Sequence, residues 1–142
     1  MSAQVVALFV STASRVALDA RHSVQALENR GVEGDRHAKP GSKRAVLLME
    51  QEILDQFGLQ PGDVREQVTV RGIDLHGLPK GTRLNVGGAV LELMGPCAPC
   101  ERMDELRQGL QTELQGRRGR FARVVRAGTF AVGDPLTAEP PA

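Results

Sequence analysis

The chain has no tryptophan, no tyrosine and only four phenylalanines among its 142 residues. Proteins that hold single-stranded nucleic acid stack its bases on aromatic side chains, and this sequence has too few for such a platform. It also lacks an excess of charge of one sign, because 18 basic residues face 17 acidic ones. A general nucleic-acid binder needs a clear basic excess on one face. The two shortages together argue against that class of protein.

Long hydrophobic runs and a cysteine framework are also missing. No run approaches the roughly 20 apolar residues that span a bilayer, and residues 1–15 lack the basic start of a signal peptide. Two cysteines do not make a secreted disulfide scaffold. We therefore expect a cytoplasmic protein with no membrane partner. The composition, 41% hydrophobic and 25% charged, is ordinary for a soluble globular chain.

Short apolar stretches separated by glycine predict a mainly β protein. A helix is expected at residues 50–57, where Ile53, Leu54 and Phe57 have helical spacing before Gly58. A hairpin is predicted around Gly87-Gly88, a pair that tolerates the positive φ of a tight turn. A second hairpin is expected around Ala127-Gly128, and a short helix at 101–106. Further strands are expected at 5–10, 24–27, 45–49 and from residue 68.

These elements predict a single barrel-like β domain over residues 1–137, with a few short peripheral helices. The last five residues, AEPPA at 138–142, are expected to form a frayed tail.

The only two cysteines lie three positions apart in GPCAPC, residues 95–100. The spacing fits half of a zinc site, a dithiol redox couple, or one metal-binding thiolate whose neighbour shapes the loop. It also fits two buried small side chains with no chemistry, as free cysteines often are. A zinc site would draw further nitrogen ligands from His22, His37 and His76, which form no paired cluster in the sequence.

Two segments carry the basic side chains in patterns suited to anions. GVEGDRHAKPGSKR, residues 31–44, presents Asp35, Arg36 and His37 in a glycine-rich loop that could form an anion nest. GRRGRFARVVR, residues 116–126, places five arginines in ten positions, and the guanidinium fork suits phosphate. The alternatives are a solvated loop and a strand with outward-facing arginines.

The ordered set of motifs resembles the MOSC domain, named for the C-terminal part of molybdenum cofactor sulfurase, in its small stand-alone bacterial form. The matching segments are GVEGDRHA, VRGIDLHGLPKGTRLNVGGAVLEL, GPCAPCERMDEL, GRRGRFARVV and GTFAVGDPL, which span about residues 31–136. The resemblance implies a mostly β, barrel-like fold that binds molybdenum cofactor, a pterin dithiolene with a phosphate. Members of the family handle sulfur for the cofactor or do redox chemistry at molybdenum.

The resemblance also implies roles for individual residues. The family's cysteine, which ligates molybdenum or carries sulfur, matches Cys100 in Cys100-Glu101-Arg102-Met103, and Cys97 becomes a bystander or a resolving thiol. Further candidates for contact with the pterin or phosphate are Asp35, Arg36, His37, Arg71, Arg117, Arg118 and Arg123.

The chain departs from the family pattern in one place. Small members usually have Gly-Glu-Asn-Leu before the central strand, where this chain has Arg65-Glu66-Gln67-Val68. Pyridoxal phosphate is associated with the family, but no lysine is placed as its Schiff base. An oxotransfer or N-reduction activity would require an external electron-transfer protein. The alternatives are a thiol–disulfide redox protein that uses Cys97 and Cys100, and a non-catalytic carrier or structural β domain.

Overall fold

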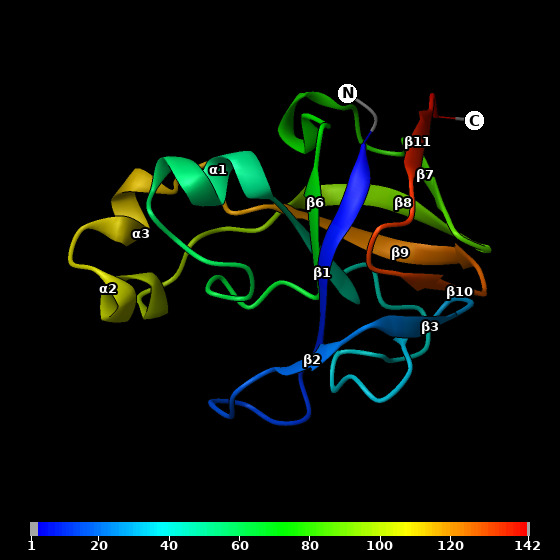
Figure 1. Ribbon diagram of the computed structural model, residues 1–142, viewed down its shortest axis with the longest axis horizontal. Helices are drawn as coiled ribbons and strands as arrows, with labels where there is room; N and C mark the ends of the chain where they lie inside the picture. The colour runs from blue at the N-terminus through cyan, green and yellow to red at the C-terminus, as the bar shows by residue number, and fades with distance from the viewer. Residues whose placement is uncertain (1–2, 142) are drawn as a thin grey trace.

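Eight strands form the larger sheet of the protein, in the order β11-β7-β8-β9-β5-β6-β1-β2. The computed structural model describes residues 3–141, and Figure 1 shows the strands on one side of the molecule and the helices on the other. The strands of this sheet are β1 (Gln4–Val10), β2 (Asp19–Arg21), β5 (Val46–Glu50), β6 (Val68–Arg71), β7 (Arg83–Val86), β8 (Ala89–Pro96), β9 (Arg120–Arg126) and β11 (Leu136–Glu139). A smaller sheet has the order β10 (Gly128–Ala131), β3 (Ser23–Leu27), β4 (Gly31–Val32).

The predicted mainly β class is confirmed, and the large sheet curls without closing into a barrel within residues 3–141. Strand β1, next to the edge strand β2, approaches the start of β11 at the opposite edge through backbone hydrogen bonds. The N–H of Val5 donates to the carbonyl of Asp134 at 2.9 Å, and the N–H of Leu136 donates to that of Ala3 at 3.0 Å. Gln4 and Pro135 also form an isolated antiparallel bridge, but β1 and β11 do not pair as a regular ladder.

The interior of this curled sheet is the main hydrophobic core. All five residues of β5 are buried, because the strand lies in the middle of the sheet between β9 and β6. Strands buried on both faces read as continuous apolar runs, which explains the sequence VLLM at residues 46–49. The other large side chains of this core include Leu8, Leu84, Leu91 and Phe130.

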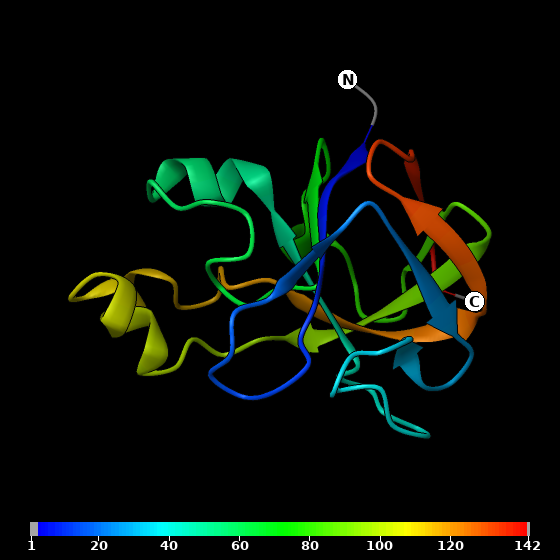
Figure 2. The same ribbon diagram turned by 60° about the horizontal axis from the view of Figure 1, so that its bottom comes forward.

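Three short helices form a second, smaller core beside the sheet. They are α1 (Gln51–Gln56), α2 (Arg102–Leu106) and α3 (Leu110–Glu113), with a 3₁₀ turn η1 at Leu75–Gly77. Met49 at the end of β5 packs with Leu54, Met103, Leu110 and Leu114. The segment between β1 and β2 runs toward α2 in both ribbon views (Figures 1 and 2), where Arg15 pairs with Glu105 at 3.2 Å. None of the helices within residues 3–141 is long and apolar enough to cross a membrane.

Most predicted elements are found, including α1, α2 and the β7–β8 hairpin. The hairpin predicted around Ala127-Gly128 is wrong. β9 pairs with β8 and β5, whereas β10 leaves the large sheet and pairs with β3. A Cβ on Gly128 would lie 2.2 Å from the carbonyl carbon of Gly88, so the chain can change sheets here only with glycine.

The predicted frayed tail at 138–142 needs correction. Ala138 and Glu139 belong to β11 and pair with Leu84 and Arg83 of β7. This edge of β7 presents backbone N–H and C=O groups that β8 does not use, and β11 pairs with them. Ala142, the last residue of the expected tail, lies outside the described residues, as do Met1 and Ser2 at the start of the expected domain.

Candidate functional site

A cavity of about 260 Å³ lies where the loop after β4, the segment before β6 and the segment before β9 meet the cysteine loop. It is lined by Arg36, His37, Arg44, Leu47, Arg65, Gln67, Cys97, Arg102, Arg118 and Phe121. We call it the arginine cavity. It brings together residues from both basic segments and from GPCAPC, which lie up to 85 positions apart in the sequence, from Arg36 to Phe121.

Five guanidinium groups and no carboxylate line the arginine cavity. None of the five is paired with a carboxylate within 4.0 Å among residues 3–141, although five other arginines of the chain are. Neutral groups hold them instead. Arg44 lies 5.5 Å from the centre of the Phe121 ring, and Arg36 Nε donates to Ser11 Oγ at 3.2 Å. Like charges gathered without counter-charges create a positive potential that favours an anion.

Arg118 is the most buried of these arginines, with 8% of its surface exposed. Its guanidinium donates to the carbonyl of Ala98 and to that of Val64, both at 3.1 Å. Its Nε is buried and has no hydrogen-bond partner within residues 3–141. A buried donor without a partner costs free energy, so this atom is available to a ligand.

Asp35 does not line the cavity, but its carboxylate contacts His37 and Gln67, which do. Its carboxylate accepts the backbone N–H groups of Ser11 and His37, each at 2.8 Å. Burial alone would raise the pKa of Asp35, but the hydrogen bonds from His37 and Ser11 outweigh it and hold this pKa below its usual value. Asp35 therefore shapes the loop as an ionised acceptor.

His37 lines the cavity and is oriented from below by that carboxylate. Its Nδ1 lies 2.8 Å from Asp35 Oδ1. Because an ionised carboxylate only accepts, Nδ1 carries a hydrogen and Nε2 is the ring atom that Asp35 leaves free. Gln67 supports the same loop: its Oε1 accepts the N–H of Leu47 at 2.8 Å, and its Nε2 lies 3.3 Å from Asp35 Oδ1.

The two cysteines are both free thiols and occupy different environments. Cys97 lines the cavity but is only 7% exposed, and burial raises the pKa of its thiol, which keeps it protonated at neutral pH. Cys100 is half-buried and does not line the cavity, but Arg118 Nη1 lies 3.6 Å from its Sγ. The cysteine loop thus places one sulfur at the cavity wall and the other beside its most buried cation.

The structure does not bring three predicted arginines to this cavity. Arg71 is exposed at the far end of β6, about 13 Å from Gln67 at 3.3 Å per residue. Arg123 is committed to Glu92 on the neighbouring strand, with Nε and Oε1 2.8 Å apart. Arg117 bonds to Gln56 and lies 5.1 Å from the centre of the Phe57 ring, on the other side of its segment from Arg118.

Three other arginines of the cavity, Arg44, Arg65 and Arg102, were not predicted as site residues. Each nevertheless stands in a motif that the sequence singled out: the glycine-rich loop, the departure Arg65-Glu66-Gln67, and Cys100-Glu101-Arg102. Arg65 has φ +67°, a left-handed conformation that favours glycine. The family pattern has glycine at this position, and glycine adopts such a φ without strain. This chain has the left-handed backbone there but carries an arginine side chain on it.

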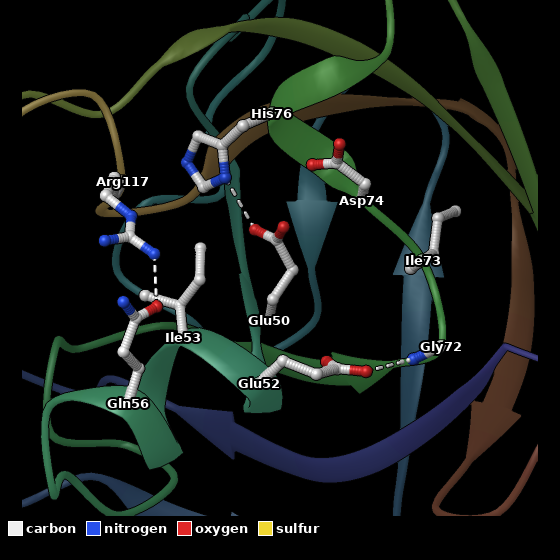
Figure 3. A pocket seen from close by; sticks show the side chains of 9 residues that line it. All are labelled: Glu50, Glu52, Ile53, Gln56, Gly72, Ile73, Asp74, His76 and Arg117. Carbon is white, nitrogen blue, oxygen red and sulfur yellow. Dashed lines mark hydrogen bonds and ion pairs between the residues drawn. The ribbon is translucent and has the colours of Figure 1, made fainter.

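A second cavity, of about 470 Å³, lies near α1 and η1 and has the opposite character (Figure 3). Three carboxylates line it, those of Glu50, Glu52 and Asp74, and His76 Nδ1 lies 2.7 Å from Glu50 Oε1. Gly119 donates its N–H to His76 Nε2 at 3.0 Å, which places the ring hydrogen on Nδ1, facing Glu50. These carboxylates would repel a phosphate, so the larger cavity does not fit an anionic ligand.

Among residues 3–141, no group of three or more His, Cys, Asp or Glu side chains is placed to hold a metal ion. The reading of GPCAPC as half of a zinc site therefore gains no further ligands from the described part of the chain.

The fold and this site define a mainly β protein with a thiol loop beside an arginine-rich cavity. The MOSC domain family matches residues 33–137, and the chain belongs to this family, which is associated with molybdenum cofactor. The resemblance seen in the sequence is thereby confirmed.

Crystal structures of other proteins share the fold. YuaD from Bacillus subtilis has a TM-score of 0.79 and 20% identity, over 97% of this chain and 96% of its own. YiiM from Geobacillus stearothermophilus has a TM-score of 0.75 and 18% identity, over 96% of this chain and 75% of its own. YiiM from Escherichia coli has a TM-score of 0.71 and 17% identity, over 98% of this chain and 71% of its own. At these identities the likeness concerns the fold alone. No curated protein matches the chain.

Proposed function

We propose that the arginine cavity binds molybdenum cofactor, or a sulfur species destined for it, with Cys100 as the thiol that ligates molybdenum or carries sulfur. The observation that carries this proposal is the set of five guanidinium groups without a carboxylate, gathered beside the only two thiols of the chain. By contrast, the larger cavity near α1 and η1 is lined by three carboxylates and by no sulfur-containing side chain.

The donor set fits the two ends of such a cofactor. A guanidinium fork binds phosphate oxygens in pairs, and a thiolate suits a soft metal. Arg36, His37 and Arg118 would hold the phosphate or pterin, with the unpartnered Nε of Arg118 as one donor. When bound, the cofactor would supply a molybdenum centre for redox chemistry or for the handling of sulfur.

The residues of the chain would bind the ligand and orient the groups that contact it. Arg118 Nη1 lies 3.6 Å from Cys100 Sγ, so one guanidinium could contact both this sulfur and an anionic ligand in the cavity. Asp35 orients the His37 ring, so that Nε2 is left for a ligand. An oxidoreductase activity would further require an external electron-transfer protein as partner, whereas a sulfur-transfer role would require a sulfur donor.

Elemental analysis of the protein purified from a host that makes the cofactor tests the proposal. We expect molybdenum to copurify with the chain. Because the chain lacks tyrosine and tryptophan, a bound pterin should also give a clear near-ultraviolet absorbance. Absence of molybdenum, together with no binding of added cofactor, would rule the proposal out.

The dithiol couple is the competing function, and the burial of Cys97 disfavours it. A reactive dithiol needs an accessible thiolate at neutral pH, whereas the Cys97 thiol is buried and its pKa is raised. An intramolecular disulfide in the purified protein, detected by mass, would favour the redox function instead.

A further inference from the structure

His76 uses both of its ring nitrogens inside the protein. Its Nδ1 lies 2.7 Å from Glu50 Oε1 (Figure 3), and its Nε2 accepts the N–H of Gly119 at 3.0 Å. The side chain is 16% exposed and lines the larger cavity. A histidine that acts as a base or as a metal ligand needs a free ring nitrogen. Because neither nitrogen is free here, the ring is suited to holding its neighbours in place.

The ring is held in one tautomer. Gly119 directs an N–H at Nε2, so Nε2 carries no hydrogen and the ring hydrogen lies on Nδ1, toward the carboxylate of Glu50. That carboxylate also accepts the N–H of Leu75, at 3.2 Å from Oε2. The carbonyl of Leu75 accepts Arg120 Nη1 at 2.7 Å, and the charges of Glu50 and Arg120 attract each other. Residues of β5, η1 and β9 therefore fix the orientation of the ring.

The hydrogen bond between His76 and Gly119 acts on two residues of the arginine cavity. The N–H of Gly119 shares one planar peptide unit with the carbonyl of Arg118, so the bond fixes the backbone from which the Arg118 side chain extends. The carbonyl of Gly119 accepts the N–H of Cys97 at 3.0 Å. Arg118 and Cys97 both line the arginine cavity. A ring in the wall of one cavity thus sets the backbone that shapes the other.

Gly119 depends on this ring for its hydrogen bond. The residue is buried, and His76 Nε2 is the only acceptor of its N–H among residues 3–141. A buried N–H that loses its acceptor carries an uncompensated desolvation cost. Without the ring nitrogen, we expect the peptide between Arg118 and Gly119 to turn toward another acceptor or toward water.

We propose that His76 is a positioning residue for the arginine cavity, and that it acts through Gly119 on Arg118 and Cys97. The inference rests on the proposed function for the role of the cavity, and it adds to that site a residue that does not line it. Its specific claim is that the acceptor nitrogen Nε2 is required, rather than the bulk of the ring.

Two substitutions separate the two hydrogen-bonding positions of the ring. The side-chain oxygen of glutamine reaches the position of Nε2, whereas the shorter asparagine reaches only that of Nδ1. His76→Gln therefore keeps an acceptor for Gly119, and His76→Asn keeps only a group that faces Glu50. Amide hydrogen exchange, measured by nuclear magnetic resonance on the full chain, reports the hydrogen bonds of Gly119 and Cys97.

The two variants should differ at these amides. We expect His76→Asn to speed exchange about tenfold at Gly119 and several-fold at Cys97, because a buried hydrogen bond is lost. His76→Gln should stay within about twofold of the wild type at both. The amide of Val5, which donates to Asp134, corrects for opening of the whole sheet. His22→Asn changes an exposed histidine that lines neither cavity and should leave these rates unchanged.

Calorimetric titration with inorganic phosphate measures the effect on the arginine cavity. His76→Asn should bind phosphate at least about threefold more weakly than the wild type, and His76→Gln about as tightly as the wild type. Wild-type exchange at Gly119 in His76→Asn, or equal effects of the two substitutions, would overturn the proposal. The exchange measurement involves no ligand, so its failure is distinguishable from a failure of the protein to bind phosphate or molybdenum cofactor.

Discussion

Asp35 shows how a buried charge can organise a site without touching its ligand. The residue is 5% exposed, and its two oxygens gather N–H groups from two segments of backbone and from a histidine ring. Charged side chains are rarely so buried unless they are paired or hydrogen-bonded. The sequence predicted Asp35 as a direct contact to the cofactor, whereas the structure gives it the role of a support for Arg36 and His37.

Replacing Asp35 should therefore cost stability. Asp35→Ala leaves the N–H groups of Ser11 and His37 without acceptors, and we expect the free energy of unfolding to fall by about 2–4 kcal/mol. Asp35→Asn keeps one oxygen and should lose less. Urea denaturation monitored by circular dichroism measures both. A loss below about 0.5 kcal/mol in Asp35→Ala would show that the loop does not depend on this carboxylate.

Arg36 should show the opposite behaviour, because it lines the cavity and holds only Ser11 Oγ. We expect Arg36→Ala to weaken phosphate-bearing ligands several-fold while the melting temperature stays within a few degrees. Arg71→Ala, an exposed arginine that lines neither the arginine cavity nor the larger one, is the matched control. A large fall in melting temperature with unchanged binding would assign Arg36 to the fold instead.

At the scale of elements, the segment between α3 and β9 connects the two cavities. Arg117 lines the acidic cavity, Arg118 lines the arginine cavity, and Gly119 follows with φ +103°. The N–H of Gly119 donates to His76, and its carbonyl accepts the N–H of Cys97 at 3.0 Å. One residue thus positions both the cysteine loop and the half-buried His76.

Gly119→Ala should disturb both cavities. A Cβ there would lie 2.3 Å from the carbonyl oxygen of Leu48 in β5, and we expect a loss of about 2–4 kcal/mol. Gly116 also has a positive φ, of +73°, but a Cβ there would meet nothing within 4 Å. Gly116→Ala should therefore cost only about 1 kcal/mol, the conformational part. Equal losses in denaturant titrations of the two variants would contradict the close contact with Leu48.

The sequence predicted elements well where the signal is local. Helical spacing before Gly58 located α1, and Gly87-Gly88 located the turn between β7 and β8. Pairing between distant strands carries no local signal, so the sequence predicts a hairpin of β9 and β10, whereas β10 pairs with β3. The three residues of β2 are all exposed and show no apolar pattern to detect.

The same limit applies to the site. The glycine-rich loop and the cysteine pair were recognised as separate motifs, and their convergence on one cavity follows from the sheet order. Arg117 and Arg118 are adjacent in the sequence, yet they line different cavities because the backbone turns between α3 and β9. Composition and spacing could not distinguish such neighbours.

At the scale of the whole molecule, Glu66 makes the free energy of unfolding depend on pH. The residue is fully buried, and burial raises its pKa above the ordinary value of 4.5. The folded state therefore binds this proton more tightly than the unfolded chain. The contribution of Glu66 is most favourable below pH 4.5 and is lost as pH rises toward the raised pKa.

Glu66→Gln should remove the loss of stability that the wild type shows as pH rises, because the amide does not ionise. Its oxygen can still accept the N–H of Gly62 and the hydroxyl of Thr69. We expect the variant to have a higher free energy of unfolding than the wild type at pH 7 and a difference that shrinks toward pH 4.5. Denaturant titrations across this range check the prediction. A difference that does not change with pH would mean that Glu66 titrates in the folded protein as it does in the unfolded chain.

Cys100 is the thiol of the proposed molybdenum cofactor site, and the molybdenum content of two cysteine variants tests this role most directly. Cys100→Ser should abolish the retention of molybdenum, because a hydroxyl is a harder and far less acidic donor than a thiol. Cys97→Ser should retain most of the metal, because the buried Cys97 thiol remains protonated. Equal loss in both variants, or full retention in Cys100→Ser, would contradict the proposed role of Cys100.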